Sequence, residues 1–121
     1  MSGRTVLVVD DDRDIRDALS DVLSDESYTV VCAADGEEGM ARLRAEPPPA
    51  VILLDWMMPR CDGGCFLRQQ RADPSVASIP VVLLTADPRA LAHSAENGVQ
   101  ARLSKPVSLD ELLAVVGRYA G

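Results

Sequence analysis

Short apolar runs and amphipathic segments alternate along the chain. Five runs are rich in β-branched residues and leucine and are bounded by turn residues, which predicts strands. These runs are Thr5–Val9, Tyr28–Ala33, Val51–Leu54, Pro80–Leu84 and Ala101–Leu103. Between them, apolar residues recur at helical spacing; the first such stripe consists of Ile15, Ala18, Leu19, Val22 and Leu23. The alternation predicts an α/β fold, with a parallel sheet that helices cover on both faces.

The polarity of each predicted strand indicates its place in the sheet. The runs at 6–9, 51–54 and 80–84 are almost continuously apolar, as expected for strands buried on both faces. The runs at 28–33 and 101–103 mix polar and apolar residues, which is typical of edge strands. These assignments predict a five-stranded sheet in the order 2-1-3-4-5, a flavodoxin-like (βα)5 three-layer sandwich.

Helix-capping signals agree with this alternation. Asp35 precedes Glu38 by three residues, and Ser108 precedes Glu111 by the same spacing, so both pairs have the spacing of a capping box. Asp87 is followed by proline, and Gly98 then has the position of a residue that ends a helix. We therefore expect one further helix between Asp87 and Gly98.

Length and charge restrict the class of protein. The 121 residues predict a single domain over 1–121, with no output domain in this chain. Twelve basic and 19 acidic residues give a net charge of −7, which argues against direct binding to nucleic acid or anionic membranes. We find neither a signal peptide nor an apolar stretch long enough to span a bilayer, and we expect a cytoplasmic monomer or weak dimer.

The cysteine content favours reduced thiols. The three cysteines are Cys32, Cys61 and Cys65, so they cannot all pair within one chain. A domain of this size does not need disulfides for stability, and we therefore expect free thiols. The C-x3-C spacing of Cys61 and Cys65 leaves a redox pair or half of a metal site as the alternative, although the chain has only one histidine to complete such a site.

Polar residues follow the predicted central strands where a ligand site is expected. Asp10 and Asp11 follow the first strand, Asp55 the third and Thr85 the fourth, while Lys105 follows the fifth. Ligands of open α/β sheets bind at the carboxyl ends of the strands. One acid there is explained as a helix N-cap, and Asp12 is our candidate. Clustered carboxylates repel one another, so the remaining acids predict a site for a hard divalent cation, with Lys105, the only lysine, positioned for a phosphoryl oxygen.

The chain resembles the receiver domains of two-component response regulators, including the chemotaxis regulator. The matching segments are VLVVDDD at 6–12, VILLDWMMPRCDGG at 51–64, VVLLTA at 81–86 and LSKP at 103–106. Each is a weak signal alone, but four in the correct order and spacing are highly specific. The resemblance implies a phosphorylation-dependent signalling domain and not an enzyme in the usual sense.

The resemblance also implies a metal site and a phosphoacceptor. Asp55 would accept a phosphoryl group from a histidine kinase or a histidine phosphotransfer protein. Asp11, Asp55 and the backbone carbonyl of Met57 would bind Mg²⁺, for which Mn²⁺ is a possible substitute. Asp10 would assist through water.

The remaining implied roles concern the response to phosphorylation. Lys105 would pair with Asp55 and then with its phosphoryl group, while Thr85 and Ala86 would contact that group. Movement of Thr85 would change the helix 4–strand 5–helix 5 surface that a downstream effector or output domain reads. The bond between Lys105 and Pro106 is cis in the family, a geometry that is accessible before proline.

One residue departs from the family pattern. Arg102 occupies the position where the family usually has tyrosine or phenylalanine. An aromatic side chain there normally turns inward as the switch threonine moves, and arginine is costly to bury without a partner. We therefore expect phosphorylation to be retained and its readout to differ, with Arg102 at the surface.

Two alternative functions remain open. A pseudo-receiver would bind partners without phosphorylation, and Arg102 is the feature that favours this interpretation. A phosphatase of the haloacid dehalogenase type would also form an aspartyl phosphate. That class usually has a second aspartate two residues after its nucleophile, where this chain has Met57.

Overall fold

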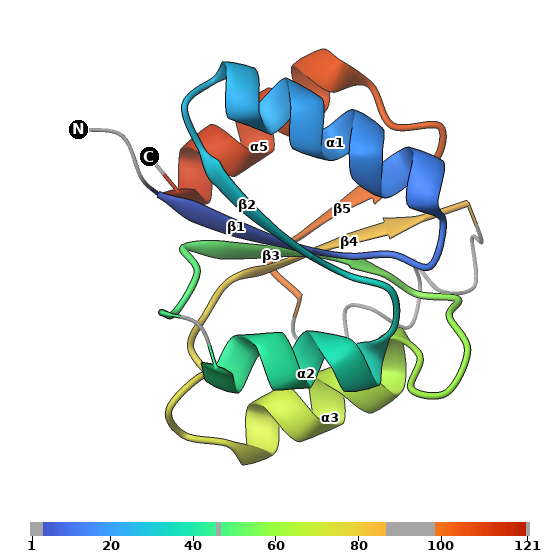
Figure 1. Cartoon of the computed structure of the whole chain (residues 1–121), viewed down its shortest axis with the longest axis vertical. Helices are drawn as coiled ribbons and strands as arrows, with labels where there is room; N and C mark the ends of the chain where they lie inside the picture. Colours follow the sequence, from blue (N-terminus) through green and yellow to red (C-terminus); the bar gives the residue numbers. More distant parts are fainter. Residues whose placement is uncertain (1–3, 46, 87–98, 121) are drawn as a thin grey trace.

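A five-stranded parallel sheet forms the centre of the molecule, as the computed structural model shows (Figure 1). The structure describes residues 4–45, 47–86 and 99–120. Its strand order is β2-β1-β3-β4-β5, which confirms the predicted order and fold class. The strands are β1 (Thr5–Val9), β2 (Thr29–Ala33), β3 (Val51–Asp55), β4 (Val81–Thr85) and β5 (Ala101–Ser104).

The described helices form a layer on each side of the sheet. In Figure 1, α1 and α5 cover one face, whereas α2 and α3 cover the other. The bounds of these helices are α1 (Arg13–Asp25), α2 (Gly36–Ala45), α3 (Gly63–Ala72) and α5 (Leu109–Ala120). The helix predicted between Asp87 and Gly98 lies outside the described residues. Within the described chain, no helix has the length and apolarity needed to cross a membrane.

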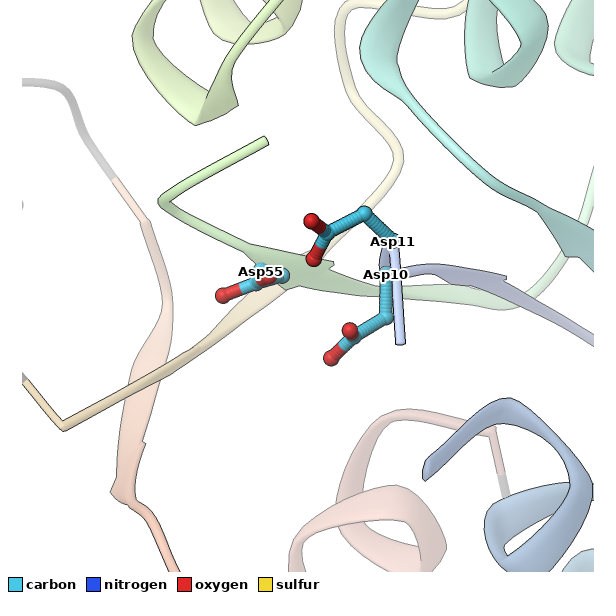
Figure 2. A group of neighbouring side chains, drawn as sticks. All are labelled: Asp10, Asp11 and Asp55. Carbon is cyan, nitrogen blue, oxygen red and sulfur yellow. The ribbon is translucent and has the colours of Figure 1, made fainter. Parts of the chain in front are cut away.

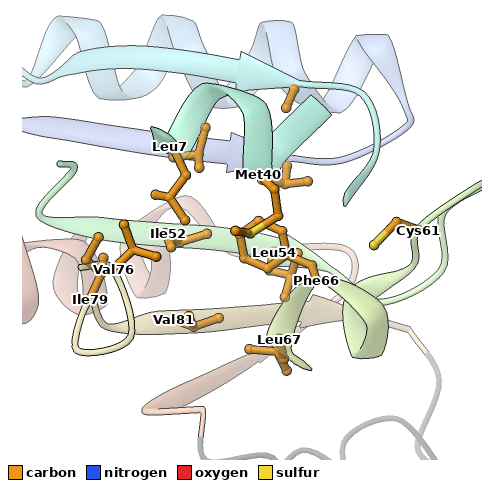
Figure 3. Close-up of a cluster of buried hydrophobic side chains, with 13 residues drawn as sticks. Leu7, Met40, Ile52, Leu54, Cys61, Phe66, Leu67, Val76, Ile79 and Val81 are labelled. Atoms are coloured by element: carbon orange, nitrogen blue, oxygen red, sulfur yellow. The ribbon is translucent and has the colours of Figure 1, made fainter. Parts of the chain in front are cut away.

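Alternating strand residues build two separate cores. All residues of β3 and β4 are buried, because helices cover both faces of these strands. One core lies between the sheet and α2 and α3, and Figure 3 shows Leu7, Ile52 and Val81 of the sheet facing Met40 and Phe66 of these helices. The other core lies against α1 and α5; its fully buried members are Val6, Val8, Leu23, Val51, Leu53, Val82, Leu84, Leu112, Val116 and Ala120.

Side-chain caps fix the beginnings of the helices. Asp12 caps α1, since its carboxylate accepts from the backbone N–H groups of Asp14 and Ile15 at 2.9 and 3.4 Å. Asp35 accepts from the N–H of Glu38 at 2.8 Å, and the Glu38 carboxylate returns to the N–H of Ala34 at 2.5 Å. The cap assigned to Asp12 and the capping-box interpretation of Asp35 and Glu38 are therefore correct.

Two of the cysteines form a disulfide, which corrects the expectation of three free thiols. The sulfur atoms of Cys61 and Cys65 are bonded, and Cys32 is the free cysteine of the described chain. The C-x3-C spacing brings the two residues together because Asp62 caps α3 between them, so that Cys65 falls in the first turn of the helix. This local geometry outweighs the argument from domain size, which concerns whether a disulfide is needed and not whether one forms.

The loop between β3 and α3 packs against the start of α2. The N–H of Gly36 donates to the carbonyl of Cys61 at 2.8 Å, and Arg60 forms an ion pair with the buried Asp35 at 2.6 Å. Arg60 has a positive φ of 63°, a strained backbone conformation for a residue with a side chain. Its double hydrogen bond to Asp35, from Nε and a terminal nitrogen, holds this conformation in place.

Gly36 is required by this close approach, and Gly117 offers a matched control. A Cβ at Gly36 would collide with the carbonyl oxygen of Cys61 and lie 2.8 Å from its sulfur, whereas a Cβ at Gly117 meets nothing within 4 Å. We predict that Gly36→Ala lowers the free energy of unfolding by about 1–3 kcal/mol through overpacking. Gly117→Ala, within α5, should raise it by up to about 1 kcal/mol through helix propensity. Urea denaturation measures both, and equal effects would contradict the close approach at Gly36.

Candidate functional site

Three carboxylates meet at the carboxyl ends of β1 and β3. Asp55 is the last residue of β3, and Asp10 and Asp11 directly follow β1, which pairs with β3 in parallel. One oxygen from each carboxylate lies within 4.8 Å of the others. Figure 2 shows the three side chains extending from these strand ends into the same region. The sheet therefore brings together the three acids that sequence reasoning selected for a metal site.

The acids differ in exposure, which gives them different chemical tasks. Asp10 is fully buried and Asp55 is 5% exposed, whereas Asp11 is exposed. One Asp10 oxygen accepts from the N–H of Asp12 at 2.9 Å, and the other accepts from the Lys105 ammonium at 3.0 Å. Both Asp10 oxygens thus have partners within the protein. Asp11 and Asp55 are the acids with oxygens more available to a ligand.

Lys105 joins the far strand to the acidic cluster. Its ammonium lies 3.0 Å from Asp10 and 3.3 Å from Asp55, and its backbone N–H donates to the carbonyl of Thr85 at 3.0 Å. The resemblance implied pairing with Asp55, and the structure adds a shorter contact with Asp10. Burial alone would lower the pKa of Lys105, but its hydrogen bonds and charge interactions with both aspartates raise that pKa overall. Lys105 is consequently held in its charged form.

Asp55 has an environment that penalises its charge. Burial is the main cause that raises its pKa to about 6, and the negative charge of Asp10 adds to the increase. The ammonium of Lys105 opposes both effects without cancelling them. Lys105 shares its single positive charge between two carboxylates. An additional cation near the Asp55 carboxylate would relieve the penalty, because it would supply positive charge that Lys105 alone does not provide.

The cluster opens into a cleft of about 430 Å³. The cleft is lined by Asp11, Asp12, Ile15, Asp55, Met57, Thr85, Ala86 and Lys105. Thr85 is buried at the end of β4, whereas Ala86 and Met57 are exposed at the rim, Met57 to 64%. The bond between Lys105 and Pro106 is cis. The residues selected from the sequence for phosphate binding thus surround the same opening as the acids.

Two arginines differ in how well the sequence predicts them: Arg102 lies at the surface as expected, whereas Arg16 makes a contact that was not expected. Arg102 is exposed in the edge strand β5, as expected, opposite Leu83 of β4. Arg16 is not among the site residues predicted from the sequence, but its guanidinium donates to the carbonyl of Asp10 at 2.7 Å. Arg16 therefore fixes the strand end that carries Asp10 and Asp11. The signal was its position one turn into α1, directly behind the acidic turn.

The donor set matches the requirements of Mg²⁺. This ion prefers oxygen ligands, uses one or two carboxylates and retains several waters. Asp11 and Asp55 provide carboxylates at an open cleft, and the raised pKa of Asp55 shows that its charge lacks full compensation. The residues present therefore fit a hard divalent cation.

The pKa of Asp55 makes stability depend on pH in a defined direction. In the folded protein this pKa is about 6, compared with about 4 when unfolded, so native Asp55 retains its proton more strongly. Its contribution to stability therefore falls as pH rises from about 4 to about 6, and the full cost is present above that interval. We predict that Asp55→Asn, without divalent cations, raises the free energy of unfolding at pH 7.5 by about 2 kcal/mol.

The gain from Asp55→Asn should disappear below pH 4, which urea denaturation across pH can show. Asp21→Asn is the matched control, because Asp21 is exposed on α1. We expect little change in stability for this control at any pH. A gain at Asp55 that is independent of pH would contradict the assignment of the cost to its charge.

Comparisons with known proteins agree with this fold. Residues 6–117 match the family described as the response regulator receiver domain. A region of the response regulator MprA from Mycolicibacterium vanbaalenii is 40% identical, covering 90% of this chain and 47% of that protein. A hybrid signal transduction histidine kinase D from Dictyostelium discoideum is also 40% identical, over 92% of this chain and 7% of that kinase. The chain thus spans less than half the length of these two relatives.

Solved structures show the same architecture. The chemotaxis protein CheY4 of Vibrio cholerae is similar with a TM-score of 0.89 and 31% identity, covering 98% of this chain and 99% of that one. A response regulator from Chloroflexus aurantiacus has a TM-score of 0.91 and 30% identity, covering 98% of each chain. Together with the family match over residues 6–117, these likenesses establish that the chain belongs to the response regulator receiver domains of two-component signalling systems.

Proposed function

We propose that this receiver domain accepts a phosphoryl group on Asp55 from a phosphohistidine of a histidine kinase or a phosphotransfer protein. The observation that carries the proposal is the position of Asp55. It ends a fully buried strand, yet it lines an open cleft together with Asp11 and the only lysine of the chain. Receiver domains are signalling domains that interact with histidine kinases and output effectors, and this geometry is consistent with that role.

The proposed transfer requires one nucleophile and stabilisation of negative charge. An oxygen of the Asp55 carboxylate attacks the phosphorus, while the phosphorus–nitrogen bond to the donor imidazole breaks and the imidazole leaves with its electron pair. Lys105, 3.3 Å from Asp55, would stabilise charge on the phosphoryl oxygens. Its contact with Asp10 keeps the ammonium at the correct edge of the sheet before any phosphoryl group is present.

Mg²⁺ would be held by Asp11, Asp55 and the backbone carbonyl of Met57, with Asp10 behind them and Mn²⁺ as a possible substitute. When bound, the ion would supply positive charge to the transferring phosphoryl group. Asp10 supports this arrangement through Lys105 and the N–H of Asp12, which fix its carboxylate beside the two proposed ligands. Arg16 supports it by holding the carbonyl of Asp10.

Phosphorylation would be read through β4 and β5. Thr85 is buried at the cleft, and its carbonyl accepts from the N–H of Lys105, so the two residues are mechanically connected. A phosphoryl group bound by Thr85, Ala86 and Lys105 would shift these strand ends and the surface that includes β5 and α5. Helix 4 of the proposed surface falls outside the described residues. Arg102 is exposed on β5, where it would face a partner directly instead of turning inward.

A second function is favoured by one observation. Because Arg102 is exposed and cannot replace a mobile aromatic residue without a burial cost, a partner-binding module without phosphorylation remains the alternative. The clustered acids count against it, since a module that only binds partners has no need of a carboxylate whose pKa is raised. Phosphorylation assays distinguish the two functions.

We predict that acetyl phosphate, a small phosphodonor, labels the protein on Asp55 only when Mg²⁺ is present. Intact mass spectrometry should detect one added phosphoryl group, and Asp55→Asn should remove at least about 90% of this signal because the nucleophile is lost. Asp21→Asn, an exposed carboxylate of α1, is the matched control and should be labelled normally. Labelling of Asp55→Asn, or normal labelling of the wild type in excess chelator, would overturn the proposed mechanism. Absence of labelling of the wild type in Mg²⁺ would favour the alternative.

Lys105→Met separates phosphoryl uptake from its consequences. Without the ammonium, Asp10 is left buried and unpaired, so we predict a loss of about 3 kcal/mol in the free energy of unfolding when no divalent cation is present. In Mg²⁺ the variant should still be labelled on Asp55. The response of hydrogen exchange in β5 to phosphorylation should be weaker, because the contact from the ammonium to the phosphoryl group is lost and only the backbone bond from residue 105 to Thr85 remains.

Arg118→Met is the control for Lys105→Met, because Arg118 is an exposed cation on α5 that does not line the cleft. It should respond to phosphorylation like the wild type. The same hydrogen-exchange response in Lys105→Met would show that Lys105 does not transmit the signal.

A further inference from the structure

The Cys61–Cys65 disulfide has one protected and one accessible sulfur-bearing residue. Cys61 is 5% exposed and lies at the edge of the core, on the side away from Val76 and Ile79 (Figure 3). Cys65 is half-buried in the first turn of α3. The side-chain amide of Gln69, one turn further, donates to both sulfurs at 3.4 and 3.3 Å. Cys65 is therefore the more exposed residue of the pair.

The disulfide anchors the end of the loop that carries Met57. This loop runs from the end of β3 at Asp55 to the start of α3 at Gly63, whose N–H donates to the carbonyl of Trp56 at 2.9 Å. Cys61 lies within the loop, and Cys65 lies just beyond it on α3. The bond between them ties the second half of the loop, which leads into α3, to the helix itself. We call this half the arm; the helix is anchored in the core by Phe66 and Leu67.

The same arm is also the part of the loop that contacts α2. The carbonyl of Cys61 accepts from Gly36, and the neighbouring Arg60 pairs with Asp35. Loss of the sulfur–sulfur bond would leave the arm held by these contacts, by the Asp62 cap on the N–H of Cys65 and by the bond from Gly63 to Trp56. Because Met57 and Asp55 begin the same loop, greater freedom in the arm reaches the cleft through a short stretch of backbone.

We propose that Cys61 and Cys65 form a reversible thiol–disulfide switch, and that the oxidised form orders the loop beside Asp55 and strengthens binding of Mg²⁺ in the cleft. The second half of this proposal rests on the proposed function, since it concerns the same cleft. The partner is a dithiol reductant, either a small molecule or a protein with two neighbouring thiols.

The exchange involves two electrons and two protons. A thiolate of the reductant attacks Sγ of Cys65, the sulfur on the accessible side, and the bond to Cys61 breaks. Cys61 leaves as a thiolate, which accepts a hydrogen bond from Gln69 and then takes a proton. The second thiol of the reductant then attacks the reductant's first sulfur, which is bonded to Cys65 in the mixed disulfide. This step releases Cys65 as a thiolate, which is also protonated. The reductant becomes a disulfide, and a disulfide oxidant reverses the sequence.

The redox half is tested in a Cys32→Ser background, because Cys32 is the free cysteine of the described chain. The protein is equilibrated in buffers of reduced and oxidised dithiothreitol, and its free thiols are then alkylated and counted by intact mass. We expect one transition, from no alkyl groups to two, that reverses on reoxidation. Thiols that stay alkylated throughout, or a disulfide that persists in fully reduced dithiothreitol, would overturn the switch.

The effect of the disulfide on the affinity for Mg²⁺ is measured by titration with Mg²⁺ alone. Trp56, the only tryptophan, directly follows Asp55 and serves as a fluorescence probe of the cleft. We expect Mg²⁺ to bind at least about fivefold more weakly after reduction, which is the lower end of typical coupling between two sites. The double variant Cys61→Ser/Cys65→Ser should bind Mg²⁺ like the reduced protein in both oxidising and reducing buffers.

The outcomes separate this proposal from the proposed function. Equal Mg²⁺ affinity in the oxidised and reduced states would overturn the coupling and leave the proposed function intact. Absence of Mg²⁺ binding in both states would overturn the metal site and with it the coupling. The alkylation result stands in either case, because it does not depend on the cleft.

Discussion

The interaction on which the site depends is the contact of one ammonium with two aspartates. Lys105 lies between Asp10, which is fully buried, and Asp55, which is nearly so. Two carboxylates about 4 Å apart repel by roughly 4 kcal/mol at an effective dielectric constant near 20, so one cation between them is needed for the pair to be tolerated. It is not sufficient, because the pKa of Asp55 remains raised to about 6. Lys105 therefore stabilises the pair of aspartates, but its single positive charge does not compensate both of them.

Much of the fold was predictable because its central strands are buried on both faces. Continuous apolar runs identified β1, β3 and β4 as central, and mixed polarity identified β2 and β5 as edges. The strand ends were less accurate. The runs were expected to stop at Leu54 and Leu84, but pairing with neighbouring strands continues through Asp55 and Thr85. Hydrogen bonding of the backbone, which does not depend on side-chain polarity, carries these two polar residues into the sheet.

The grouping of the candidate site was also predictable, because parallel strands place their carboxyl ends at one edge. What the sequence could not supply were contacts that depend on side-chain reach. The approach of Lys105 to Asp10, the bond from Arg16 to the carbonyl of Asp10 and the disulfide of Cys61 all belong to this class. Each requires the relative orientation of two elements or a capped turn, neither of which follows from hydrophobic pattern alone.

The distance along the chain between Lys105 and its partners has a consequence for folding. Lys105 contacts Asp10 across a separation of 95 residues, whereas the acids are already brought together when β1 pairs with β3. A growing chain can thus assemble the acidic edge well before β5 joins the sheet. In that interval the acids lack the ammonium of Lys105, so their mutual repulsion opposes the pairing of β1 with β3 until β5 is in place.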